Sequence, residues 1–184
     1  MKTRSITLIA LFVAVMIAFG AIPTLVIPFV PVPFTFQMLG VMLVGSILGA
    51  KRGFVSMLVF IALVAAGMPV LSGYHGGLGV LLGPTGGYVL AWPLAVLVIG
   101  WLIDRTTDSK WNVVQYYLAI FLGILLIYLI GVPWFALYSH IAMGVAVAGN
   151  VPLFLLDCVK AVIATAVAVP LRQRLRVLRH SHNF

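Results

Sequence analysis

Long apolar stretches, separated by short polar clusters, dominate the pattern of residues along the chain. No Lys, Arg, Asp or Glu occurs in residues 5–50, 53–103 or 111–156. Each stretch is about twice as long as the roughly 20 apolar residues that a membrane-spanning helix needs, so each predicts two spans joined by a short connection. The three stretches thus predict three helical hairpins. Their six helices are expected at residues 5–22, 35–50, 53–71, 86–103, 114–132 and 150–171.

The composition excludes a soluble domain. Of the 184 residues, 64% are hydrophobic and 8% are charged, whereas a soluble globular domain carries about 25% charged residues to keep its surface hydrated. The chain is also too apolar for intrinsic disorder, and its single cysteine, Cys158, cannot form an internal disulfide. The predicted fold is an all-α integral membrane protein, in which residues 1–184 form a single transmembrane domain.

The positions of the charges predict the orientation in the lipid bilayer. The formal net charge is +8, and ten of the 11 basic residues lie in four clusters before, between and after the hairpins. Basic residues favour the cytoplasmic side, so both termini are predicted to be cytoplasmic. The basic balance therefore follows from topology and does not indicate a nucleic-acid partner. The clusters are Lys2 and Arg4; Lys51 and Arg52; Arg105 and Lys110; and Arg172, Arg174, Arg176 and Arg179.

The first predicted helix allows further interpretations. Its basic start, its apolar run and a small-residue site near Phe19-Gly20-Ala21 also resemble a secretory signal peptide, which would be cleaved. Against cleavage, Ala10, Ala14 and Ala18 repeat at four-residue spacing and place small side chains on one helix face, where another helix can approach closely. That face fits packing within the chain or docking of a partner membrane protein, and both interpretations stay open.

Two segments outside the helices are predicted to be irregular. Pro28, Pro31 and Pro33 precede the second span, and proline removes helix hydrogen bonds. Between residues 73 and 87, seven of fifteen residues are glycine, so this loop can fold closely against a ligand or a neighbouring helix. At membrane depth such backbone is tolerated only beside protein or a water-lined cavity. The loop lacks the Gly-Lys-Ser/Thr ending of phosphate loops, so if the chain performs active transport, the energy must come from a partner or an ion gradient.

Asp157 and Lys160 are the charged residues that fall inside a predicted span. They are three residues apart and therefore share one face of a helix. A charge near the centre of a bilayer is costly, and such residues usually face the bundle interior and mark a substrate path. The two residues can form a structural ion pair, or they can bind a solute that carries both N–H groups and a carboxylate.

Four further polar side chains are candidates for the same site, each on weaker grounds. Gln37, at the start of the second span, can both donate and accept hydrogen bonds, and Tyr74, His75 and Tyr88 add polar groups in or beside the glycine loop. Tyrosine is also common at membrane interfaces without any ligand role. Asn150 is predicted to cap the last helix.

Enzymatic and metal-binding functions are not supported. Ser139 and His140 are adjacent, and adjacent residues do not face each other on a helix. The sequence contains no GxSxG or HExxH motif. An intramembrane aspartyl protease needs two carboxylates at one site, whereas only Asp157 lies in a span. His75, His140 and the C-terminal histidines fall on opposite sides of the predicted membrane, so we predict no catalytic residue, metal site or cofactor.

A set of motifs spread along the chain carries a family resemblance. They are Pro31-Val-Pro-Phe-Thr-Phe-Gln37, Leu48-Gly-Ala-Lys51-Arg-Gly53, Ala66-Gly-Met-Pro69-Val-Leu-Ser-Gly73, Gly76-Gly-Leu-Gly-Val-Leu-Leu-Gly83-Pro-Thr-Gly-Gly-Tyr88 and Pro152-Leu-Phe-Leu-Leu-Asp157-Cys-Val-Lys160. Together they resemble the BioY family, the biotin-binding S components of energy-coupling-factor (ECF) vitamin transporters. The segment from Gly83 to Tyr88, combined with Asp157-x-x-Lys160, is quite specific to that family.

The resemblance implies a six-helix S-component bundle that holds biotin as its substrate near the extracellular side of a prokaryotic cell membrane. Such proteins associate with a transmembrane coupling protein and two ABC-type ATPases, although some BioY proteins are thought to work without the full complex. In S components an Ala-x-x-x-Ala pattern in the first helix contacts the coupling protein, and Ala10, Ala14 and Ala18 fit this pattern. An S component for riboflavin or thiamin is the main alternative, and a small intramembrane enzyme is a weaker one.

The resemblance also implies roles for the candidate residues. Biotin offers two ureido N–H groups and a ureido carbonyl, an apolar ring and chain, and a terminal carboxylate. Asp157 is expected to accept a hydrogen bond from a ureido N–H. Lys160, Gln37, Tyr88 and the residue at position 75 are expected to complete the polar contacts.

One departure from the family pattern concerns the carboxylate of the ligand. Some members have a basic residue after the loop tyrosine and a small amide at position 75, whereas this chain has Val89 and His75. Recognition of the carboxylate therefore falls to Lys160, to His75 or to backbone N–H groups of the glycine loop.

Overall fold

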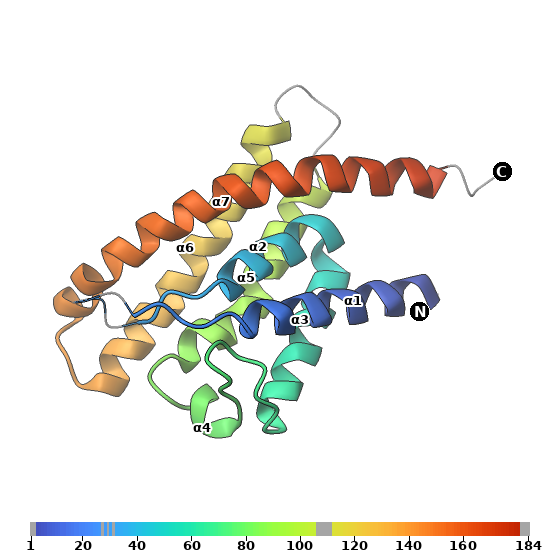
Figure 1. Cartoon of the computed structure of the whole chain (residues 1–184). Helices are drawn as coiled ribbons and strands as arrows, with labels where there is room; N and C mark the ends of the chain where they lie inside the picture. The colour runs from blue at the N-terminus through green and yellow to red at the C-terminus, as the bar shows by residue number, and fades with distance from the viewer. Residues whose placement is uncertain (1–2, 27, 29, 31, 106–111, 181–184) are drawn as a thin grey trace.

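The structure, a computed structural model, describes residues 3–26, 28, 30, 32–105 and 112–180 (Figure 1). Within these residues the chain forms six helices of 12 residues or more, together with the single-turn helix α4. The same residues contain no β-strand, only isolated backbone bridges in two loops. The helices are α1 (Thr3–Gly20), α2 (Gln37–Leu48), α3 (Ala50–Ala65), α4 (Leu78–Leu81), α5 (Gly86–Asp104), α6 (Asn112–Ser139) and α7 (Met143–His180).

The all-α prediction is confirmed, and each predicted span holds one of the longer helices. By length and composition, α5, α6 and α7 can each cross a membrane, while α1 and α2 are shorter apolar helices. On the outside of α6 and α7, large apolar side chains such as Leu129 and Leu155 are 64% and 59% exposed. A helix that is apolar on all sides belongs in a protein core or in a membrane, so these outer faces fit contact with lipid.

Two helices extend well beyond their predicted limits. The predicted connection at 133–149 is mostly helical, because α6 ends later and α7 begins earlier than expected. Pro133, which the prediction places in the connection, and Pro152, which lies at the start of the last predicted span, are both inside these helices. Proline is tolerated within membrane helices where neighbouring groups satisfy the freed backbone. The chain instead turns at His140, whose φ angle is 52°.

The central helix of the bundle is α5. It contacts α2, α3, α4 and α6, while α7 packs on α2 and α6, and α1 packs on α2 and α3. Along α5, the side chains of Ala95, Val96, Ile99 and Ile103 are at most 1% exposed. Burial of a continuous apolar strip on α5 therefore holds the surrounding helices together.

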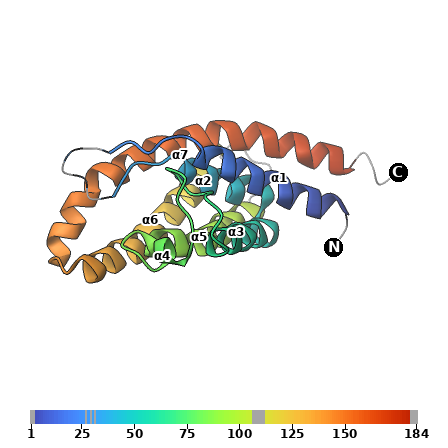
Figure 2. The same cartoon turned by 60° about the horizontal axis from the view of Figure 1, so that its bottom comes forward.

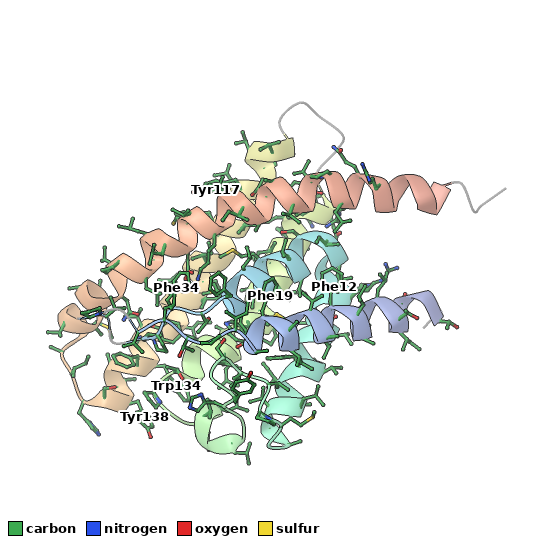
Figure 3. All side chains as sticks on the ribbon, in the orientation of Figure 1. Phe12, Phe19, Phe34, Tyr117, Trp134 and Tyr138 are labelled. Carbon is green, nitrogen blue, oxygen red and sulfur yellow. The ribbon has the colours of Figure 1, made fainter. Side chains whose placement is uncertain are left out.

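One face of α1 packs into the bundle. Met16 is fully buried, and Figure 3 shows Phe12 and Phe19 on the side of α1 that faces α2. This packing favours a bundle helix over a cleaved signal peptide.

The alanine face of α1 points the other way. Ala10, Ala14 and Ala18 are all exposed. Of the two interpretations that the sequence leaves open, packing within the chain is therefore excluded for this face.

The irregular segments lie away from the chain ends. Figures 1 and 2 show the N-terminal end of α1 and the C-terminal end of α7 at the same end of the molecule. In both views the described part of segment 21–36 runs beside the N-terminal half of α7. The shared end agrees with the prediction that both termini lie on one side of the membrane. Its assignment to the cytoplasm stays a prediction.

An ion pair stabilises the junction between the C-terminal end of α2 and the N-terminal end of α3. Arg172 of α7 donates from Nη1 to the carbonyl oxygen of Ser46 at 2.7 Å and pairs through Nη2 with the carboxylate of Asp104. The other carboxylate oxygen of Asp104 accepts the N–H of Ala50, the first residue of α3, at 3.0 Å. A cation thus meets the C-terminal end of α2 and an anion the N-terminal end of α3, as helix dipoles favour. Gly49 joins the helices with a φ of 78°, and a Cβ there would overlap Asp104.

We expect Asp104→Ala to lower the free energy of unfolding by about 1.5 kcal/mol, because it leaves the buried Arg172 without its anion, although the exposed carboxylate is partly screened by solvent. Thermal unfolding of the detergent-purified protein measures this change. Lys51→Ala removes an exposed charge beside the same turn and is the matched control, with an expected change below about 0.5 kcal/mol. Equal unfolding midpoints for the two variants would show that the cluster adds no stability.

Candidate functional site

A cavity of about 250 Å³ lies among α2, α5, α6, α7 and the two irregular segments. Its volume is just below the roughly 300 to 1,000 Å³ of pockets for drug-sized ligands, so it suits a small solute. Most of its wall is apolar, with a few polar groups that can orient a ligand. The lining residues are Thr24, Val32, Pro33, Thr35, Gln37, Met38, Leu71, Ser72, His75, Val80, Thr85, Tyr88, Val89, Trp92, Tyr128, Leu153, Asp157 and Lys160.

Asp157 and Lys160 lie in this cavity and form an ion pair. Nζ of Lys160 is 2.7 Å from Oδ1 of Asp157, and Oδ2 of Asp157 accepts a hydrogen bond from the Tyr128 hydroxyl at 2.8 Å. Asp157 is 2% exposed and Lys160 is 5% exposed. Burial of two charges is repaid only when further hydrogen bonds satisfy them, and Tyr128 supplies one of these.

Lys160 also holds the segment that precedes α2. Its Nζ donates to the carbonyl oxygen of Thr35 at 2.7 Å and lies 3.5 Å from the centroid of the Phe34 ring, in cation–π geometry. Figure 3 shows Phe34 where this segment passes α7. Lys160 therefore connects an irregular wall of the cavity to α7 and uses two of its three hydrogens within the protein.

Tyr88 and Asn150 join α5 to α7. The Tyr88 hydroxyl donates to Oδ1 of Asn150 at 3.0 Å, and Nδ2 of Asn150 donates to the carbonyl oxygen of Ala146 at 2.8 Å. The prediction that Asn150 caps the last helix is wrong, because α7 already begins at Met143. The Tyr88 ring lies against Gly131 of α6, where a Cβ would overlap it. Only glycine leaves room for the ring at this position.

Gln37 lines the cavity, but its amide is used within the protein. Nε2 donates to the carbonyl oxygens of Val70 at 2.8 Å and Met16 at 3.2 Å. Oε1 accepts hydrogen bonds from the N–H and the hydroxyl of Ser72, at 2.9 and 3.0 Å. All four hydrogen-bonding positions of the amide are filled. Gln37 thus joins α1, α2 and the loop after α3, which is a positioning role at the cavity wall.

The two remaining candidates, His75 and Tyr74, both lie in the loop between α3 and α4, but only His75 lines the cavity. His75 lines the cavity, with Nδ1 3.1 Å from the carbonyl oxygen of Ser72. Tyr74, whose φ angle is 60°, is 68% exposed and does not line the cavity. The structure therefore leaves Tyr74 apart from the other predicted site residues, which surround one cavity: Asp157, Lys160, Gln37, Tyr88 and His75.

Tyr128 is a site residue that the sequence analysis missed. Its hydroxyl contacts Asp157, and its ring meets Tyr88 and Phe154 edge to face, at centroid distances of 5.9 and 5.2 Å. The available signal was a phenol within the apolar span at 114–132. That signal is weak, because tyrosine is common in membrane proteins near the interface.

The arrangement can bind a small solute, and its residues do not form a catalytic set. Ser139 and His140 do not line the cavity. Among the residues that the structure describes, no group of three or more His, Cys, Asp or Glu side chains is placed to hold a metal. One carboxylate, one ammonium group, two phenols and an imidazole lie in a mostly apolar wall, together with the Gln37 amide and several hydroxyl groups. Such a cavity suits a partly apolar solute that has both hydrogen-bond donors and acceptors.

Comparison with known proteins gives consistent matches along the chain. A family model described as the BioY family matches residues 1–177. The probable biotin transporter BioY of Bacillus subtilis is 41% identical over 170 residues, which cover 91% of this chain and 89% of that protein. The biotin transporter BioY of Rhizobium etli is 37% identical over 169 residues, which cover 89% of this chain and 90% of that protein.

A solved structure is also similar. The crystal structure of the S-component for biotin from an ECF-type ABC transporter matches with a TM-score of 0.88 and 32% identity, over 94% of this chain and 92% of that one. This match confirms the predicted S-component bundle. The relatives are transporters, which confirms the prediction that the chain is not an enzyme. Because the family model covers all but its last seven residues, the chain belongs to the BioY family.

Proposed function

We propose that this chain is an S component that binds biotin and mediates its uptake across a prokaryotic cell membrane. The observation that carries the proposal is the buried cluster of Asp157, Lys160 and Tyr128 in the wall of a mostly apolar cavity. The names of the relatives and the similar S-component for biotin support the same ligand.

The cluster has the hydrogen-bonding groups that a ureido group needs. Each carboxylate oxygen of Asp157 has two acceptor positions and uses one, for Lys160 or for Tyr128. Each oxygen can therefore accept one more N–H. Lys160 has a third hydrogen that it can donate to the ureido carbonyl. Hydrogen bonds to charged groups are roughly twice as strong as neutral ones, so this end of the cavity provides most of the polar recognition.

The buried charge also orients the ligand. A ligand carboxylate placed beside Asp157 would be repelled strongly, because little solvent screens the two charges there. The neutral ureido end is therefore the one that meets Asp157. The apolar ring and chain lie against residues such as Val89, Trp92 and Leu153. The carboxylate extends toward the exposed loops, where it keeps part of its hydration.

Isothermal titration of the purified protein in detergent tests the ligand directly. We expect biotin to bind in the absence of ATP with micromolar or tighter affinity, because the lining side chains already surround the cavity. Excess riboflavin or thiamin should not displace it. The absence of heat up to millimolar biotin would contradict the assignment, and displacement by either vitamin would point to the alternative S components.

Asp157→Asn should weaken biotin binding more than tenfold, or by more than about 1.4 kcal/mol, because an amide nitrogen replaces one acceptor oxygen. Tyr128→Phe should weaken binding less, since it removes one donor and leaves the carboxylate. Tyr117→Phe is the matched control, because Tyr117 stacks on Phe121 outside the cavity. Unchanged affinity in Asp157→Asn would show that Asp157 has only a structural role.

The exposed alanine face of α1 supports docking of the coupling protein of an ECF module. Ala10, Ala14 and Ala18 are exposed, and the neighbouring Ile6 and Leu11 are 56% and 54% exposed. Small side chains allow a second membrane helix to come close. In this proposal two ABC-type ATPases drive uptake through the coupling protein, and both termini of the chain lie in the cytoplasm, as the basic clusters predict.

We expect Ala14→Trp to prevent association with the coupling protein while leaving biotin affinity unchanged, because the indole blocks close approach on a face remote from the cavity lining. Co-purification with the ECF module, together with titration of the isolated chain, measures the two effects separately. Ala166→Trp, on an exposed position of α7, is the matched control and should still assemble. If Ala14→Trp assembles as well as the control, α1 does not use this face for docking.

A further inference from the structure

One face of α5 is left uncovered by the other helices. The exposed side chains of this helix, apart from Asp104, recur every three or four residues and therefore lie along one stripe. The stripe is apolar along the helix, and a cation follows it directly after the helix ends. Its residues are Leu90, Leu94, Leu97, Trp101 and Arg105.

The length of this stripe matches one leaflet of a bilayer. Trp101 comes 11 residues after Leu90, which is about 17 Å of helix, and half of a hydrocarbon core is about 15 Å. Tryptophan commonly lies where the hydrocarbon meets the headgroups. Asp104 pairs with Arg172 of α7, so the Arg105 end lies on the side of the membrane that carries the basic clusters. The stripe thus offers an acyl chain one leaflet of apolar surface below a cation at headgroup level.

Arg105 is held in place at that level. The carbon of its guanidinium group lies 3.7 Å from the centroid of the Trp101 ring, in cation–π geometry. Stacking uses the face of the guanidinium and none of its N–H groups, which lie in its plane. Among the residues that the structure describes, Arg105 forms no ion pair, and the carboxylate of Asp104 is taken by Arg172 and by the N–H of Ala50. Arg105 is therefore an ordered cation that lacks an anion within this part of the chain.

We propose that this face of α5 is a binding site for an anionic phospholipid: the lipid phosphate accepts hydrogen bonds from Arg105, and an acyl chain lies along the leucine stripe. The planar fork of a guanidinium matches phosphate oxygens two at a time. In a zwitterionic lipid the ammonium group of the headgroup compensates the phosphate, so an unpaired cation favours the anionic lipid. Because Arg105 is already stacked on Trp101, little side-chain entropy is lost on binding.

The proposed lipid site is separate from the surfaces described above. Within the described residues, α1 contacts α2 and α3 but not α5, so the stripe is not part of the alanine face. None of the stripe residues lines the cavity. The inference therefore does not depend on the identity of the transported solute.

Quenching of Trp101 fluorescence tests the proposal in the purified full chain, reconstituted into nanodiscs of phosphatidylcholine. Bromine atoms on an acyl chain quench an indole at close contact, and the difference from Trp101→Phe isolates the emission of Trp101 among the four tryptophans. Replacing a growing fraction of the lipid with brominated phosphatidylglycerol or brominated phosphatidylcholine gives the relative affinity of this face for the two headgroups. We expect phosphatidylglycerol to be preferred about fivefold, which corresponds to about 1 kcal/mol for one cation at the membrane surface.

Arg105→Gln should make the two affinities nearly equal, because it removes the cation and leaves the leucine stripe. Arg174→Gln is the matched control, since it removes the same charge from an exposed position of α7 near the same membrane surface, and it should keep the preference. The emission of each variant is compared with that of the same variant in unbrominated lipid, so loss of the stacked guanidinium does not itself change the result.

The outcomes separate the proposal from its alternatives. Equal quenching by the two brominated lipids would contradict headgroup recognition. A preference that persists in Arg105→Gln, or that Arg174→Gln lowers to the same extent, would show a general attraction of the basic surface and overturn the role of Arg105. Emission from Trp101 that neither lipid quenches would show that protein, such as a second copy of the chain, covers the stripe.

Discussion

The ion pair between Asp157 and Lys160 determines how the elements around the cavity are positioned. Two charges inside an apolar bundle are stable only when their other hydrogen-bonding positions are satisfied. Tyr128 of α6 donates to the carboxylate, while the Thr35 carbonyl and the Phe34 ring meet the ammonium group. These partners come from different parts of the chain. Satisfying one buried pair therefore holds α6, α7 and the segment before α2 around the cavity.

A second cation on α7 extends this constraint to the other end of α2. Lys160 holds the carbonyl of Thr35, just before α2, and Arg172 holds the carbonyl of Ser46, near its end. The two cations are 12 residues apart on α7, or about 18 Å of helix, and the two carbonyls are 11 residues apart, or about 16 Å. The earlier cation holds the start of α2 and the later cation holds its end, so α2 and α7 run in the same direction side by side. Arg172, which the sequence assigns to topology alone, thus has a structural role as well.

The helices and the buried pair could be predicted because both follow from the cost of charge in a bilayer. Uncharged stretches of this length allow little besides paired helices, and in such a background Asp157 and Lys160 are easily recognised. Neutral polar residues are harder to assign. Gln37 and Tyr128 are both polar groups in apolar segments, yet one is bonded to backbone and serine while the other contacts the buried carboxylate. Their partners lie far along the sequence, and neither spacing nor composition shows them.

The two polar clusters in the cavity wall differ in how many hydrogen-bonding positions remain free for a ligand. Gln37 has no free hydrogen-bonding position, so a ligand cannot bind its amide without breaking the loop contacts. Asp157 keeps two acceptor positions and Lys160 keeps one hydrogen. A ureido group can therefore add its hydrogen bonds while Lys160 still holds Thr35. A site whose wall segments stay in place on binding avoids much of the free-energy cost of ordering side chains and loops. On the proposed function, energy from ATP therefore serves to move the bound ligand across the membrane and not to bind it.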